Sequence, residues 1–160
     1  MYSFLHIFLA NLFLHFVVVH LNHKSMPFSK FILSYVLTTV VFFIIDMTWL
    51  GLIAKGLYAR YLGAFLSDQI NWVAAIVFYL LFIVGIFLFV IFPALEKESW
   101  RHALLYGALF GFFTYATYDL TNLATLKGWP LNIVFIDIIW GMVLTASVSV
   151  AGYFISNYFK

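Results

Sequence analysis

Three aspartates stand inside long apolar runs of the sequence, where a carboxylate is costly. They are Asp46 in FIIDMTWLGL, Asp119 in YDLTNLATLKGWP and Asp137 in VFIDIIWG. An acid in mid-membrane costs about 2.5–3.5 kcal/mol on an insertion scale, so three facing lipid would cost about 8–10 kcal/mol. We therefore expect all three to face the protein interior, close together, and we take them as the candidate catalytic residues.

Each acid has neighbours on its own helix face that could hold it or a substrate. Residues three or four positions apart share a face of an α-helix. Indole N–H and amide N–H groups are donors that suit a carboxylate. The candidate substrate-binding residues are Trp49 beside Asp46, Tyr115 and Asn122 beside Asp119, and Trp140 beside Asp137.

No lysine or arginine lies in these apolar runs to neutralise the acids. Close carboxylates without a cation cannot all ionise, so at least one is expected to hold a proton. The alternatives are a bound cation, or the side-chain ends of Lys55 and Lys127 reaching down from the membrane surface. No cofactor is predicted. If a metal ion binds, the oxygen ligands favour Mg²⁺, Mn²⁺ or Ca²⁺ over zinc.

The composition defines the solvent of this chain. Of 160 residues, 66% are hydrophobic and only 9% are charged, whereas soluble domains are about half apolar and about a quarter charged. A chain of this length cannot bury so much apolar surface in one aqueous core. The net charge of +2 and the absence of a basic run argue against nucleic acid as a partner. Because there are no cysteines, disulfides and thiol chemistry are excluded.

Four apolar runs are long enough to cross a bilayer, which takes about 20 residues. The runs cover about 31–54, 72–95, 103–126 and 131–155. The links at 93–102 and 127–130 are short, which predicts antiparallel neighbours, and the link at 55–71 is expected to be a partly helical interfacial segment. The fold predicted for residues 26–160 is an all-α, polytopic, compact four-helix transmembrane bundle.

Residues 1–25 form a separate hydrophobic N-terminal extension. They lack the basic start and the small-residue cleavage site of a signal peptide. The segment is either a fifth span or upstream sequence ahead of a true start at Met26. Both alternatives stay open at this stage.

The charges next to the spans predict the orientation. Lysine and arginine gather on the cytoplasmic side of membrane proteins. One side carries five of them and the other carries three, which places the C-terminus in the cytoplasm: Lys24, Lys30, Lys97, Arg101 and Lys160 against Lys55, Arg60 and Lys127. Membrane lipids are the expected partners. Small-residue stripes at GALFG (107–111) and along the fourth span indicate helix contacts and allow a homo-oligomer.

The motifs IDMTWLGL, YDLTNLATLKGWP and IDIIWG together resemble an uncharacterised family of small predicted bacterial inner-membrane proteins, a domain of unknown function (twenty-one seventy-seven). The resemblance covers about residue 26 to the end of the chain. It implies a four-span protein of the bacterial inner membrane, and it supplies no substrate, cofactor or catalytic residue.

Three functions are compatible with these residues. In the first, the protein is an enzyme on a lipophilic, lipid-like or isoprenoid-like substrate, with one protonated and one ionised aspartate as acid and base. In the second, it is a small proton-coupled transporter of a cation. In the third, it is an accessory subunit of a membrane complex with no site of its own. We favour the enzyme slightly, because few helices are present for alternating access and the acids lie nearer one surface than the midplane.

Overall fold

The computed structural model describes residues 26–67 and 69–160, so both alternatives for residues 1–25 fall outside the described part. The described chain is helical. Its elements in order are α2 (Phe28–Thr48), the π-helix η1 (Trp49–Ile53), α3 (Lys55–Leu62), α4 (Trp72–Ile86), the π-helix η2 (Phe87–Ile91), α5 (Phe92–Glu96), α6 (Trp100–Thr125) and α7 (Leu131–Phe159).

Within the described ranges, three helical stretches are long and apolar enough to cross a membrane: α2 with η1, α4 through α5, and α7. The fourth predicted span, α6, has 26 residues, which at 1.5 Å per residue is also long enough. Its tyrosines, threonines and Asp119 make it less apolar than the other three. The all-α membrane bundle predicted from the sequence is confirmed.

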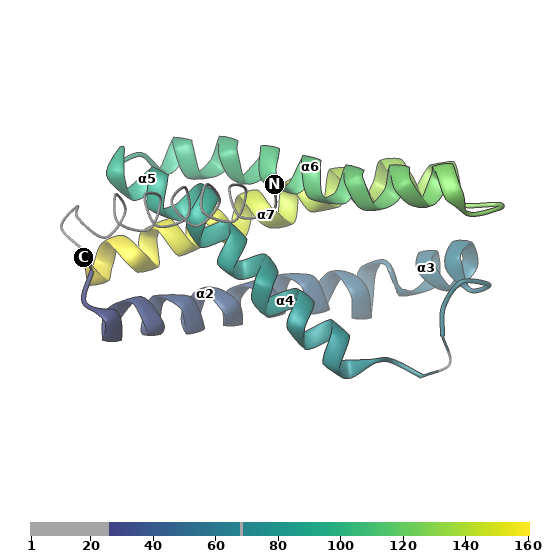
Figure 1. Ribbon diagram of the computed structural model, residues 1–160, viewed down its shortest axis with the longest axis horizontal. Coiled ribbons are helices and arrows are strands. Elements are labelled where there is room, and N and C mark those ends of the chain that lie inside the picture. The colour runs from purple at the N-terminus through teal and green to yellow at the C-terminus, as the bar shows by residue number, and fades with distance from the viewer. Residues whose placement is uncertain (1–25, 68) are drawn as a thin grey trace, which may run out of the picture.

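Helix α7 is the central element of the bundle. Helix α6 packs along it on one side and α2 along it on another, while α4 meets the bundle chiefly through its continuation η2. In Figure 1, α6 and α7 run side by side, and α4 crosses the bundle obliquely. The small helix α3 lies at the same end as the turn between α6 and α7, opposite the C-terminus.

The contact between α6 and α7 is close because glycines line it. A Cβ atom on Gly107 would lie 2.7 Å from Oγ of Ser149, and one on Gly111 would collide with the backbone oxygen of Gly141. The small-residue stripes are therefore contacts between helices of the same chain, as expected from the sequence.

Two features at the ends of the membrane-spanning helices differ from the sequence-based expectation. The α4 stretch continues through Pro93 to Glu96, because a proline is tolerated in the first turn of α5 just after η2. Trp72, Trp100 and Trp129 stand at the edges of the predicted spans, where the sequence predicts an aromatic belt at the membrane surface. Trp129 is instead only 7% exposed and packs with Leu62 and Ile133 in a small core cluster. Trp72 and Trp100 are exposed as expected.

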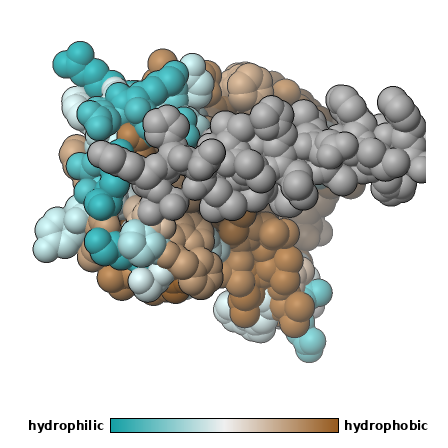
Figure 2. All heavy atoms as spheres, turned by 60° about the vertical axis from the view of Figure 1, so that its left-hand side comes forward, coloured by the Kyte–Doolittle hydropathy of each residue, from teal (hydrophilic) through white to brown (hydrophobic). Residues whose placement is uncertain are grey.

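Helix α6 ends at Thr125, and Gly128 in the turn that follows has a φ of 77° that suits glycine. The charged residues of the described chain lie mainly at its ends. Figure 2 shows hydrophilic side chains gathered toward one end of the visible face, with hydrophobic side chains along its flank. This distribution is that of a bundle whose sides contact lipid and whose ends contact water.

Candidate functional site

The three aspartates face the protein interior, as the energetic argument predicted. Asp46, Asp119 and Asp137 are 4%, 0% and 7% exposed, although they come from three different helices. Most of the large side chains on the outer faces of these helices are aliphatic or aromatic. The polar chemistry of the membrane-spanning part is thus concentrated inside the bundle.

Asp137 is held by a short chain of hydrogen bonds that runs through α3. The hydroxyl of Tyr58 donates to Oδ1 of Asp137 at 2.6 Å, and the indole Nε1 of Trp49 donates to the same hydroxyl at 3.2 Å. Because the Trp49 donor orients the Tyr58 oxygen, the phenol proton is directed at the carboxylate. In a medium of low dielectric constant, such a chain is stronger than the same bonds in water.

Asp46 also accepts a hydrogen bond from a tyrosine of another helix. The hydroxyl of Tyr79 on α4 donates to Oδ2 of Asp46 at 3.0 Å. The indole of Trp140, on α7, also interacts with this carboxylate. Each of the two acids is therefore served by one tyrosine and one tryptophan, none of them from the aspartate's own helix.

The expected pairing of each aspartate with the tryptophan three residues later is wrong in detail. Trp49 serves Asp137 through Tyr58, and Trp140 serves Asp46. The two indoles stack with ring centroids 4.3 Å apart and an interplanar angle of 8°. The helix changes to the wider π-helical turn η1 at Trp49, and each indole reaches a partner outside its own helix. Such π-helical turns are frequent at functional sites.

Asp119 is the acid to which no tyrosine hydroxyl donates. Both of its carboxyl oxygens are buried and make no hydrogen bond within the described residues, and the same holds for Nε1 of Trp129. The indole of Trp129 nevertheless lies near this carboxyl group, and Asp137 is near enough to act on it electrostatically. Asn122, expected to donate to Asp119, does not do so. An unpaired charge in such a place is strongly unfavourable, so the neutral carboxyl form suits this position.

Helix α3 places Tyr58 in the site. The sequence suggested that its tyrosines lie at the membrane surface, and the helix does carry exposed Lys55 and Arg60. Tyr58 instead points inward to Asp137. Burial, and next the hydrogen bond to Asp137, raise the pKa of Tyr58 well above its ordinary value. This phenol therefore remains a proton donor across the physiological pH range.

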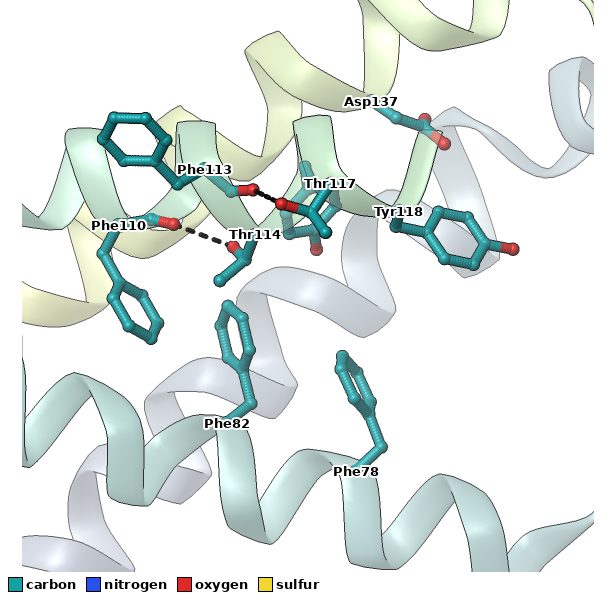
Figure 3. Close-up of a pocket in the computed structure, with 9 residues that line it drawn as sticks. Phe78, Phe82, Phe110, Phe113, Thr114, Thr117, Tyr118 and Asp137 are labelled. Atoms are coloured by element: carbon teal, nitrogen blue, oxygen red, sulfur yellow. Dashed lines mark hydrogen bonds between the residues drawn. The ribbon is translucent and has the colours of Figure 1, made fainter. Parts of the chain in front are cut away.

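A groove of about 730 Å³ has Asp137 among its lining residues (Figure 3). Two of its phenylalanines, Phe78 and Phe82, come from α4, and the others come from α6. The carboxylate of Asp137 is the charged group of the lining. The groove is lined by Phe78, Phe82, Phe110, Phe113, Thr114, Tyr115, Thr117, Tyr118 and Asp137.

Tyr115 connects the groove with the acids. It lines the groove and lies within electrostatic reach of Asp46, Asp137, Tyr58 and Tyr79. Its ring packs against Gly141, where a Cβ atom would collide with it. Of the predicted substrate-binding residues, Tyr115 lies in the groove, while Trp49 and Trp140 lie beside the acids.

A metal ion receives no added support from the arrangement. Across 26–67 and 69–160, no three histidine, aspartate or glutamate side chains lie together closely enough to hold one. The divalent cation considered from the oxygen ligands therefore stays a prediction. The local geometry favours proton chemistry between carboxyl and phenol groups.

Sequence reasoning missed both tyrosines that donate to the acids, Tyr58 and Tyr79. Their partners lie 79 and 33 residues away, so no local pattern could pair them. A signal was nevertheless present, because a buried carboxylate needs donors and the chain offers no cation in its spans. The chain contains ten tyrosines, whose hydroxyl groups can donate to a carboxylate.

Comparison with known proteins identifies the family. No curated protein and no solved structure matches the chain. The family model described as "Predicted membrane protein (DUF2177)" matches residues 31–154, which include all three buried aspartates and the whole groove. The chain belongs to this family of predicted membrane proteins.

Proposed function

We propose that this protein is a membrane-embedded acid–base enzyme that takes a lipophilic substrate from the bilayer through the groove between α4 and α6. The single observation that carries the proposal is that the lining of an aromatic groove includes a buried carboxylate that already accepts a hydrogen bond from Tyr58. A merely structural acid has no need of an approach from the lipid side. We further propose that it resides in the bacterial inner membrane with a cytoplasmic C-terminus.

The roles follow from the geometry of each acid. Asp137 lines the groove and is the candidate base, because an ionised carboxylate can accept a proton and Tyr58 already donates a hydrogen bond to it. Asp119 neighbours Asp137 and accepts no hydrogen bond from a tyrosine hydroxyl, so it suits the protonated role of a general acid. Asp46 is held by Tyr79 and Trp140 and has a supporting role.

The test compares lipid extracts from cells that lack the gene and carry either the wild-type protein or Asp137→Asn. Asparagine keeps the size of the side chain and cannot accept a proton as a base does. We expect at least one acyl, ether or isoprenoid species to depend on the wild-type gene and to return to the level of gene-free cells in Asp137→Asn.

The matched control is Glu96→Gln, the same chemical change at an exposed acid at the end of α5. This variant should keep the wild-type lipid profile. Membrane fractions must contain equal amounts of all three proteins. If the lipid profile is the same with and without the gene, the enzyme proposal is wrong. In that case, pH-dependent uptake of organic cations into proteoliposomes would support the transporter instead.

A further inference from the structure

We propose that the polar head of the groove's ligand is a hydrogen-bond donor without negative charge, an alkyl amine or a long-chain alcohol, and not a phosphate. This inference rests on the proposed function and names the substrate class of the same site. It follows from three features of the groove: its lining charges, the direction of its hydroxyl groups and its exposure to the lipid side.

The lining contains a carboxylate and no cation. Among the nine lining residues, Asp137 is the charged group, and lysine, arginine and histidine are missing from the set. A phosphate head placed there would bring two like charges together in a medium of low dielectric constant. An ammonium or hydroxyl head would instead donate to the carboxylate.

The threonine hydroxyls of the groove also favour a ligand that donates hydrogen bonds. Thr114 donates to the carbonyl of Phe110 at 2.8 Å, and Thr117 donates to that of Phe113 at 2.6 Å. Both bonds are drawn in Figure 3. Since these protons are already used within α6, the two oxygens can offer a ligand only lone pairs. At these two positions the groove wall therefore accepts hydrogen bonds from a head group.

The remaining lining suits a hydrocarbon chain. Phe78 and Phe113 are more than half exposed at the mouth, where the bundle meets lipid, while Phe82 and Phe110 pack against each other with centroids 5.6 Å apart. Aromatic faces also attract cations, at about 0.5–2 kcal/mol each in other proteins. A ligand whose hydrocarbon chain lies along α6 contacts the aromatic side chains of the groove, and an amine at its end donates to Asp137.

The experiment uses the full-length protein in lipid nanodiscs and a long-chain alcohol that carries a photoreactive diazirine in its chain. Irradiation should label the segment 110–118, which is read by peptide mass spectrometry. Dodecylamine, dodecanol and dodecyl phosphate then compete with the label. We expect half-suppression by dodecylamine at a concentration about tenfold or more below that of dodecyl phosphate.

Two variants separate head recognition from partition into the membrane. Asp137→Asn experiences the same bilayer concentrations of each amphiphile, so the loss of the amine preference in this variant assigns the preference to the carboxylate. Thr117→Trp places a large side chain at an exposed position of the groove wall and should abolish labelling at 110–118. Glu96→Gln should behave like the wild type.

Each result has a defined meaning. A wild-type preference for dodecylamine or dodecanol that disappears in Asp137→Asn supports the inference, and the order of the two distinguishes an amine from an alcohol. Equal competition by all three, or the same ranking in Asp137→Asn, overturns the head class while the groove and the proposed function stand. Absence of labelling at 110–118 in the wild type overturns both.

Discussion

At the scale of single residues, the site is defined by how each carboxyl group obtains its partners. Asp46 and Asp137 each accept a tyrosine hydroxyl from another helix, whereas Asp119 accepts nothing. An unpaired, fully buried acid is tolerable in its neutral form and very costly in its charged form. Chemically equal side chains therefore occupy unequal positions, which is the prerequisite for dividing acid and base roles.

Replacement of Asp119 by asparagine tests this inequality. Because asparagine resembles a neutral carboxyl group in size and polarity, we expect Asp119→Asn to change the free energy of unfolding by less than about 1 kcal/mol. Thermal unfolding of the detergent-solubilised protein measures this. A loss of several kcal/mol would mean that Asp119 is charged and held by a partner, contrary to its surroundings.

Tyr58→Phe should destabilise the protein by about 1–3 kcal/mol, because it leaves Asp137 and the indole N–H of Trp49 without their shared partner. Tryptophan emission should shift as well, since Trp49 loses its acceptor. The matched control is Tyr61→Phe. It makes the same change on the same helix, at a tyrosine whose hydroxyl makes no hydrogen bond within the described residues. Equal effects of the two changes would show that the bond to Asp137 contributes nothing.

The pH dependence of the same pair follows from the raised pKa of Tyr58. The folded protein keeps the phenol proton at a pH at which the unfolded chain, with an ordinary tyrosine pKa of about 10, releases it. The stability linked to this proton is complete below pH 10 and falls as the pH rises above it. Wild type should therefore lose its stability advantage over Tyr58→Phe above about pH 10. A constant difference across that range would contradict the assignment.

At the scale of elements, the site depends on one close helix pair and one interrupted helix. Gly111 and Gly141 let α6 and α7 approach until their backbones touch, which sets Asp119 and Tyr115 against α7. The π-helical turn η1 begins at Trp49, whose indole donates to Tyr58 on α3. A small displacement of either element would therefore weaken the hydrogen bonds to the aspartates, because their donor–acceptor distances are near 3 Å.

The helix pair can be tested with matched glycine substitutions. In Gly111→Ala the new methyl group would meet the backbone of Gly141 and lie 2.9 Å from Oγ1 of Thr145, so we expect a loss of about 1–3 kcal/mol. In Gly56→Ala on α3 the methyl group meets nothing within 4 Å and should stabilise that helix by up to about 1 kcal/mol. Melting temperatures of the two variants should move in opposite directions. Equal shifts would refute the close contact.

The sequence predicted the burial of the three acids and the helical fold. Both follow from the free-energy cost, in lipid, of charged side chains and of backbone N–H and C=O groups without hydrogen bonds. It predicted the wrong tryptophan for Asp46 and Asp137, because spacing along one helix contains no information about a neighbouring helix. It also placed Trp129 at the membrane edge and Tyr58 at the surface. Both residues are instead drawn inward by partners that only the tertiary fold brings near.

At the scale of the whole molecule, the bundle has chemically different ends. The acids, α3 and the turn between α6 and α7 belong to one end, and the C-terminus lies at the other, where Nζ of Lys160 donates to the carbonyl of Leu95 at 3.4 Å. The excess of lysine and arginine on the C-terminal side predicts that this end faces the cytoplasm.

A C-terminal fusion tests the orientation directly. Green fluorescent protein fused after Lys160 should fluoresce, and alkaline phosphatase, which is active only outside the cytoplasm, should remain inactive at the same position. The reverse pattern would place the aspartates on the cytoplasmic half of the membrane. The burial of the acids and the groove would be unchanged, since neither depends on orientation.

The parallel stack of Trp49 and Trp140 has an optical consequence. Two aromatic rings this close and this nearly parallel share their electronic excitation, so near-ultraviolet circular dichroism should contain a paired band that neither indole produces alone. A ligand that displaces Asp137 also moves the ring of Trp49, because Tyr58 is hydrogen-bonded to both residues. The paired band should therefore change when a ligand binds, so that binding can be measured without an added label.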